Sequence, residues 1–82
     1  MIKEKALRVW WIRNVPNKPT YYPVADIKEA IKRLNELADA DLKNPLVESN
    51  VGGLQVYENK EWLDYEDEQG RSIDDIMEEE KR

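Results

Sequence analysis

The 82-residue chain contains no cysteine, no histidine and no phenylalanine. Without cysteine it cannot form disulfide bonds or thiolate–metal sites, and the sequence favours a reducing compartment. Without histidine it lacks the commonest general base and the usual transition-metal ligand. Most nucleophilic triads therefore cannot be assembled. We expect a protein that is not an enzyme, with no catalytic residues, no bound metal and no cofactor.

Long hydrophobic runs are also missing. No apolar stretch approaches the roughly 20 residues that a membrane span needs, and the N-terminal sequence MIKEKAL has no signal-peptide core. We therefore expect a cytoplasmic protein without membrane insertion. The length predicts one domain over residues 1–82. Its ordered core is expected at about residues 6–77, and residues 78–82 are expected to form a frayed acidic tail.

Charge is distributed unevenly along the chain. Lys and Arg outnumber Asp and Glu by nine to seven through Tyr57, and the remaining residues carry four basic against eleven acidic side chains, which gives the net charge of −5. Because an acidic surface repels phosphates, we expect no direct nucleic-acid binding. A charge run is typical of a solvated face, and the alternative is an acidic surface that mimics nucleic acid. Its candidate residues are Asp64, Glu66, Asp67, Glu68, Asp74 and Asp75.

The same acidic residues partly resemble a calcium-binding loop. Asp64, Glu66 and Glu68 alternate before Gly70, as acidic ligands do in an EF-hand. The glycine falls one residue late, however, and the flanking helices are absent. We therefore favour a solvated acidic turn and predict no metal site.

The first predicted element is a strand at residues 7–13, where β-branched and aromatic residues alternate with polar ones. One side is expected to carry Leu7, Val9 and Trp11, and the other Arg8, Trp10 and Arg13. Prolines at 16 and 19 end this strand. Residues 14–23 are predicted to form an ordered extended loop, whose Tyr21-Tyr22-Pro23 end packs back onto the sheet.

The clearest predicted element is an amphipathic helix at residues 26–42. Asp26 suits the N-cap, and Glu29 follows three residues later, as in a capping box. Asn44 precedes Pro45 and ends the helix. The apolar stripe, at spacings of three and four, comprises Ile27, Ala30, Ile31, Leu34, Leu37, Ala38 and Leu42.

Two further strands and a short helix complete the prediction. Gly52-Gly53 opens a strand that runs to Tyr57, and these glycines allow a bulge or a positive φ. A turn at residues 58–61, with Asn59 at positive φ, leads into a strand at residues 61–65. Ser72 with Asp75 predicts the start of a C-terminal helix. The order is β-α-β-β-α, an α+β fold with a three-stranded sheet, one main amphipathic helix on one face and a short C-terminal helix.

The segment RVWWIRNVPNKPTYYP holds two of the three Trp and two of the four Tyr residues. Trp11 is assigned to the core. Trp10, Tyr21 and Tyr22 are the candidate anchors of a partner-binding patch, because aromatic residues concentrate at interface hot spots, and Arg8 and Arg13 would form its rim. The alternative, that these aromatic residues cover the core of this chain, remains open, as does a homodimer.

Several short stretches together point to a family. They are Trp11-Ile12-Arg13-Asn14-Val15-Pro16, Tyr22-Pro23-Val24, Glu29-Ala30, Leu37-Ala38-Asp39-Ala40-Asp41-Leu42, Asn50-Val51-Gly52-Gly53-Leu54-Gln55-Val56, Glu61-Trp62 and Asp67-Glu68-Gln69-Gly70. In their order and spacing the chain resembles small bacteriophage- and prophage-encoded proteins, some of which are labelled superinfection-exclusion or superinfection-immunity proteins. The resemblance implies an accessory protein in the host cytoplasm. Our leading hypothesis is a non-enzymatic module that binds a host or phage protein.

Overall fold

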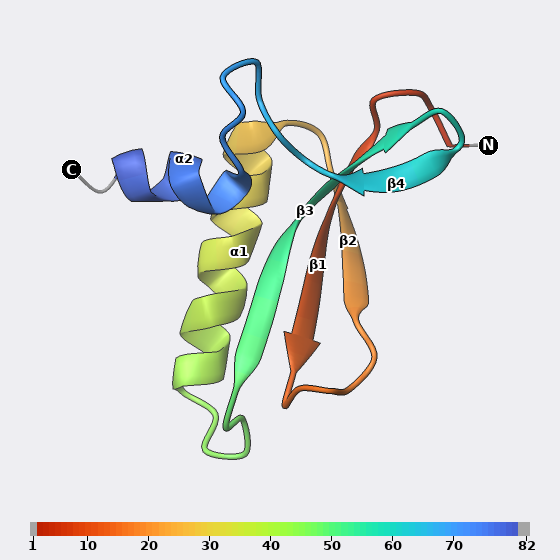
Figure 1. Cartoon of the computed structure of the whole chain (residues 1–82). Coiled ribbons are helices and arrows are strands. Elements are labelled where there is room, and N and C mark those ends of the chain that lie inside the picture. The colour runs from red at the N-terminus through yellow and green to blue at the C-terminus, as the bar shows by residue number, and fades with distance from the viewer. Residues whose placement is uncertain (1, 81–82) are drawn as a thin grey trace.

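Four strands and two helices are formed within residues 2–80, which the computed structural model describes (Figure 1). In chain order they are β1 (Leu7–Arg13), β2 (Thr20–Val24), α1 (Ile27–Leu42), β3 (Asn50–Glu58), β4 (Glu61–Asp64) and α2 (Ile73–Glu80). The α+β class, the main helix and the short C-terminal helix are confirmed. The prediction of three strands is wrong, because the described residues form a four-stranded sheet.

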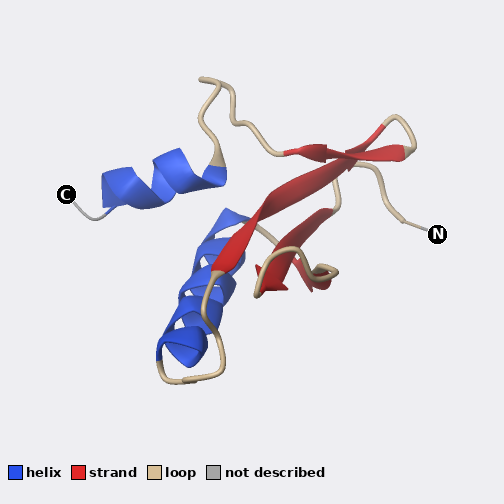
Figure 2. Cartoon of the chain, turned by 60° about the horizontal axis from the view of Figure 1, so that its bottom comes forward, coloured by secondary structure: helices blue, strands red, loops and turns tan. Residues whose placement is uncertain are grey.

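The sheet has the order β2-β1-β3-β4, and all neighbouring strands are antiparallel. In its centre, Val9 of β1 lies opposite Tyr22 of β2 and Leu54 of β3. Side chains alternate across a strand, so Val9 and Trp11 point to the same face. The helix α1 packs along this face, and the opposite face of the sheet is turned away from it (Figure 2).

The strand that the sequence analysis missed is β2. It pairs with β1 from Leu7 opposite Val24 to Trp11 opposite Thr20, where we expected an extended loop. Pro23 cannot donate a hydrogen bond to a ladder, but β2 is an edge strand with a partner on one side only, which is where proline is tolerated. The prolines of this segment therefore led us to predict a loop where the chain forms an edge strand.

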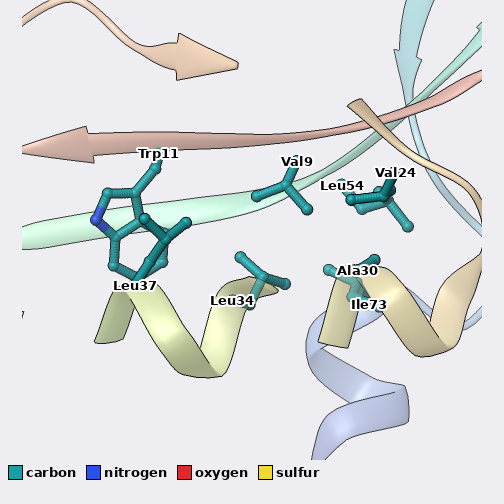
Figure 3. Close-up of a cluster of buried hydrophobic side chains, with 8 residues drawn as sticks. All are labelled: Val9, Trp11, Val24, Ala30, Leu34, Leu37, Leu54 and Ile73. Atoms are coloured by element: carbon teal, nitrogen blue, oxygen red, sulfur yellow. The ribbon is translucent and has the colours of Figure 1, made fainter. Parts of the chain in front are cut away.

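The hydrophobic core lies between α1 and the sheet (Figure 3). Trp11, which is 7% exposed, is a core residue, as the sequence predicted. Ile73 at the start of α2 inserts beside Ala30 of α1 and attaches the second helix to the same core. The buried cluster comprises Val9, Trp11, Val24, Ala30, Leu34, Leu37, Leu54 and Ile73.

The two ends of α1 differ in how well the sequence predicted them. At the start, the Asp26 side chain accepts a hydrogen bond from the backbone N–H of Glu29 at 2.8 Å, which confirms the N-cap. At the end, Leu42 is 85% exposed, and Asp41 is only 5% exposed. Asp41 follows Leu37 by four residues and therefore shares its face. The assignment of Leu42 to the apolar stripe was wrong for this reason.

The C-terminal helix α2 begins with a reciprocal cap. Asp75 donates its backbone N–H to the Ser72 hydroxyl at 3.3 Å, and its carboxylate accepts the Ser72 N–H at 3.2 Å. This confirms the predicted helix start. The helix continues through Glu80, so residues 78–80, which we had assigned to a frayed tail, are helical. Residues 81–82 of that predicted tail lie outside the described residues.

The two glycines of β3 have a different role from the one we predicted. Each residue of β1 from Leu7 to Arg13 pairs with one residue of β3 without interruption, so this ladder contains no bulge. Neither Gly52 nor Gly53 has a positive φ. Each glycine instead makes room for an indole ring. A Cβ atom at Gly52 would lie 2.2 Å from Cε3 of Trp11, and one at Gly53 would lie 2.8 Å from Nε1 of Trp10. The two rings lie against the strand on opposite faces.

The β3–β4 turn contains two residues in the left-handed region, Asn59 at φ 53° and Lys60 at φ 66°. This confirms the predicted turn, and two positive φ angles are the pattern of a type I′ turn, in which Asn-Gly is preferred.

We expect Lys60→Gly to raise the free energy of unfolding by about 0.5–1 kcal/mol, because glycine adopts this conformation without the strain of a Cβ atom. Urea denaturation measures the change. The control Lys43→Gly lies at φ −88° and should bring no gain; equal effects would contradict the prediction.

Candidate functional site

The face of the sheet opposite α1 carries a group of large polar and aromatic side chains. We call this surface the open face, because no helix in the described part of the chain packs on it (Figure 2). The strand registers place its members on the same side, since Arg8 pairs with Gln55, Gln55 with Asp64, and Tyr57 with Trp62. The open face comprises Arg8, Trp10 and Ile12 of β1, Tyr21 of β2, Gln55 and Tyr57 of β3, and Trp62 and Asp64 of β4.

Arg8 is the centre of the open face. Its guanidinium carbon lies 3.8 Å from the ring centroid of Tyr21 and 4.1 Å from that of Trp62. Its Nε donates a hydrogen bond of 2.8 Å to Oε1 of Gln55. Arginine stacks well on aromatic faces because its planar cation is attracted to the ring quadrupole. The side chain of Arg8 is therefore held between two rings that come from two different strands.

A second aromatic contact extends this cluster. Trp62 meets Tyr57 edge to face, with ring centroids 5.2 Å apart and an interplanar angle of 63°, a geometry that contributes about 0.5–1.5 kcal/mol beyond area burial. Within residues 2–80 no carboxylate forms an ion pair with Arg8. The open face thus presents an ordered cation that the described residues leave without a counter-charge.

The surface beside this cluster is hollowed only slightly. A depression of about 230 Å³ lies beside Trp10 and Tyr21 and is bordered by Ile12, Pro19, Gln55 and Asp64. Pockets that enclose small molecules usually measure about 300–1,000 Å³. A larger hollow of about 770 Å³ follows the outer side of α1, but it is lined only by the helix and its cap and has no second wall. The shape of the open face therefore suits contact with another macromolecule.

The structure brings together three of the five residues that the sequence assigned to an aromatic patch. Trp10, Tyr21 and Arg8 share the open face. Tyr22 lies opposite Val9, packs against the core on the helix side and has the guanidinium of Arg33 5.4 Å from its ring centroid. The patch as predicted is therefore divided between two faces.

Arg13 is the other residue that the sequence analysis misplaced. It follows Trp11 by two residues in β1 and so points to the helix side, where its Nε contacts Asp41 at 2.5 Å. The grouping of Arg13 with Trp10 violated the period of two in a strand.

Gln55, Tyr57 and Trp62 are members of the open face that the sequence analysis missed. The strand alternation already put Gln55 with Tyr57 and Trp62 with Asp64. The missing information was the strand order, because only the neighbouring positions of β1, β3 and β4 bring Trp62 over Arg8.

The acidic residues beyond β4 have several different roles. Asp67 accepts the backbone N–H groups of Arg71 at 2.8 Å and Gln69 at 2.9 Å, and it pairs with Nε of Arg71 at 2.7 Å. The backbone hydrogen bond from Arg71, with its guanidinium, holds the pKa of Asp67 below its ordinary value. Arg71 also pairs with Glu79 of α2.

Other carboxylates of this region remain at the surface. Asp75 caps α2, as described above, and Asp64, Glu66, Glu68 and Asp74 are exposed. Among the residues that the structure describes, no three acidic side chains converge in a way that could hold a metal ion.

Asp41 forms a buried polar cluster on the helix side of the sheet. Its carboxylate accepts hydrogen bonds from Nε1 of Trp11 at 2.9 Å, Nε of Arg13 at 2.5 Å and Nδ2 of Asn50 at 3.1 Å. Burial raises the pKa of Asp41, but these hydrogen bonds and the charge of Arg13 lower it by more, so the pKa lies below its ordinary value. The cluster ties the end of α1 to β1 and β3 and has a structural role.

Comparison with known proteins identifies the family. The model of the family described as superinfection exclusion gene product 17 matches residues 6–82, which is almost the whole chain. The chain belongs to this family. The family is phage-encoded, so the resemblance derived from the sequence is confirmed. No curated protein and no solved structure matches the chain. None of the helices that the structure describes has the length and apolar character required to span a membrane.

Proposed function

We propose that the chain is a non-enzymatic accessory protein of a phage that acts in superinfection exclusion by binding a host or phage protein in the host cytoplasm. The observation that carries this proposal is the open face, where Arg8 is held between Tyr21 and Trp62 on a surface that neither helix covers. The family supplies the biological setting.

The composition and order of the open face support protein binding. Tyrosine, tryptophan and arginine are the residues most enriched at interface hot spots. The Arg8 side chain is already fixed by its two rings and by Gln55, so binding loses little further side-chain entropy. A carboxylate on the partner would supply the counter-charge that Arg8 lacks within residues 2–80.

A double substitution tests the proposal in cells. We expect Tyr21→Ala/Trp62→Ala to abolish exclusion, because it removes both rings that position Arg8. The measurement is the plating efficiency of a superinfecting phage on bacteria that express the protein. The plating efficiency should be reduced with wild type and should return toward that of cells without the protein with the double variant, because the loss of a hot spot weakens binding by about tenfold or more.

A matched control uses apolar side chains on a different surface. Leu42 and Leu46 are 85% and 80% exposed, so Leu42→Ala/Leu46→Ala removes two apolar side chains and leaves the open face intact. This variant should still exclude the phage. Circular dichroism must show that both variants are folded. A folded Tyr21→Ala/Trp62→Ala protein that excludes phage as well as wild type would contradict the proposal.

The alternative proposal is an acidic nucleic-acid mimic that inhibits a nucleic-acid-binding protein. Its support is the exposure of Asp64, Glu66, Glu68 and Asp74, whereas Asp67 and Asp75 are engaged in internal hydrogen bonds. Under this alternative, exclusion would persist in the Tyr21→Ala/Trp62→Ala variant, and partner binding would weaken steeply with salt.

A further inference from the structure

The edge of β3 next to β4 is only partly paired. β3 contains nine residues and β4 four, and the β3–β4 ladder covers only Gln55 to Glu58. Beyond it, Tyr65 donates its backbone N–H to the Leu54 carbonyl at 3.0 Å. In the described part of the chain no strand pairs with residues 50–53 on the side opposite β1. Half of this strand therefore lies at a sheet edge.

Backbone groups at Gly52 point toward this unpaired side. In an antiparallel sheet, successive residues direct their N–H and C=O groups alternately to the two sides. The backbone groups of Tyr57 face the β1 side, because its N–H donates to the carbonyl of Ala6 and its carbonyl accepts the N–H of Lys5. The backbone carbonyl of Leu54 faces the other side, where it accepts the N–H of Tyr65. Gly52 precedes Leu54 by two residues, so its backbone N–H and C=O point to the unpaired edge of β3.

The sheet edges differ in how they are protected. The outer edge strand β2 contains Pro23, and β4 is only four residues long and bounded by Glu61 and Asp64. Proline, short length and charge are the usual means of blocking an edge. Residues 50–53 of β3, Asn-Val-Gly-Gly, contain neither a proline nor a charged side chain, so this edge has neither of these protections.

A groove runs along this edge. It measures about 260 Å³ and lies between Gly52 and Gly53 of β3 on one side and the beginning of α2 on the other, with Trp10 at its margin. Its polar lining is acidic, because Asp64, Glu66 and Asp74 border it. These three carboxylates form no ion pair within residues 2–80. Complementary charge therefore favours a basic occupant.

A second copy of this chain fits the groove less well. Pairing two β3 edges would bring two sets of these carboxylates together, and the chain already has a net charge of −5. Like charges placed opposite each other across an interface oppose association. The acidic lining thus selects against self-pairing.

We infer that the unpaired edge of β3 binds an extended, lysine- or arginine-bearing segment of a partner protein as an added strand in line with β4. Backbone groups of Gly52 bond this segment, and Asp64, Glu66 and Asp74 contact its basic side chains. This mode of binding, strand addition, derives affinity from main-chain hydrogen bonds and specificity from the side chains. The inference rests on the proposed function, since it names the kind of segment by which the partner is recognised.

Titration of the ¹⁵N-labelled full chain with a synthetic peptide tests the inference. The probe is an acetylated and amidated octapeptide of alternating valine and lysine. We expect saturable binding with a downfield shift of the Gly52 amide proton, as it gains a hydrogen bond. The same peptide methylated at every backbone nitrogen keeps its charge but cannot donate to the strand, and should bind at least about tenfold more weakly.

Two triple variants separate local charge from net charge. Asp64→Asn/Glu66→Gln/Asp74→Asn should weaken binding by about tenfold. The control Glu29→Gln/Glu36→Gln/Asp39→Asn makes the same change in net charge on the exposed side of α1 and should change affinity less than about twofold. Equal losses in both variants would show that only net charge matters and would overturn the inference.

Other outcomes also contradict strand addition. Absence of a Gly52 shift, or unchanged affinity for the methylated peptide, overturns it, and a concentration-dependent Gly52 shift without peptide shows that the edge binds a second copy. The Tyr21→Ala/Trp62→Ala variant should bind the octapeptide normally. If this variant loses exclusion in cells but still binds the octapeptide, the result supports the role of the open face and strand addition at β3 separately. The plating assay tests the first proposal and the peptide titration tests the second, so the failure of one does not prevent the test of the other.

Discussion

Gly52→Ala is expected to lower the free energy of unfolding by about 3 kcal/mol, the upper part of the range for overpacking a core. The new Cβ atom would lie 2.2 Å from Cε3 of Trp11 and 2.9 Å from the carbonyl oxygen of Trp10. Trp11 cannot move aside easily, since its ring is buried and its Nε1 donates to Asp41. Urea denaturation monitored by circular dichroism measures the loss.

Gly53→Ala is the matched control, one residue away in the same strand. Its Cβ atom would lie 2.8 Å from Nε1 of Trp10. Trp10 is on the open face, however, and its ring can tilt toward solvent. We expect a loss below about 1 kcal/mol, as for substitutions whose surroundings can relax. Equal losses of stability in the two variants would show that the backbone of β3, and not the position of each indole ring, determines the cost of adding a Cβ atom at Gly52 and Gly53.

Asp41→Ala is expected to have a comparable effect, about 2–4 kcal/mol. The substitution removes the acceptor of three hydrogen bonds and leaves the indole N–H of Trp11 unsatisfied in the core. Asp39→Ala, two residues earlier in α1 on its exposed side, should change stability by less than about 0.5 kcal/mol. Thermal and urea unfolding compare the variants, and a stable Asp41→Ala protein would show that these contacts contribute no net stability.

The stability contributed by Asp41 should also depend on pH. The hydrogen bonds from Arg13, Trp11 and Asn50 outweigh the effect of burial, so the pKa of Asp41 is lower in the folded than in the unfolded chain. The unfolded state therefore binds the proton first as pH falls. We expect the stability difference between wild type and Asp41→Asn to be constant from neutral pH to about pH 5, and to shrink below about pH 4. A difference that stays constant through the acid range would contradict this assignment.

The elements that the sequence predicted well are those whose signals are local. The Asp26 cap, the Ser72–Asp75 cap and the turn at Asn59 all depend on residues within a few positions of one another. The strand β2 was missed because prolines usually end strands, and the exception applies only at a sheet edge. Whether a strand is an edge strand depends on its distant neighbours.

The same limit explains the errors in the candidate site. Alternation alone separates Tyr21 from Tyr22 once β2 is known to be a strand, and it also moves Arg13 to the helix side. The contact of Arg8 with Trp62 could not be predicted, because it needs β3 and β4 to follow β1 in the sheet. Asp41 did carry a usable signal, since it lies on the face of Leu37, but a charged residue on an apolar stripe is usually assigned to solvent.

The three tryptophans of the chain lie in three separate environments. Trp11 donates to a carboxylate in the core, Trp10 lies against a glycine at the margin of the groove, and Trp62 contacts a guanidinium on the open face. Since the chain has no other tryptophan, the tryptophan emission of a variant that keeps one of the three comes from one region alone. The protein thus contains its own optical reporters, by which global unfolding, occupation of the groove and contact at the open face can be followed as distinct emission changes without an added dye.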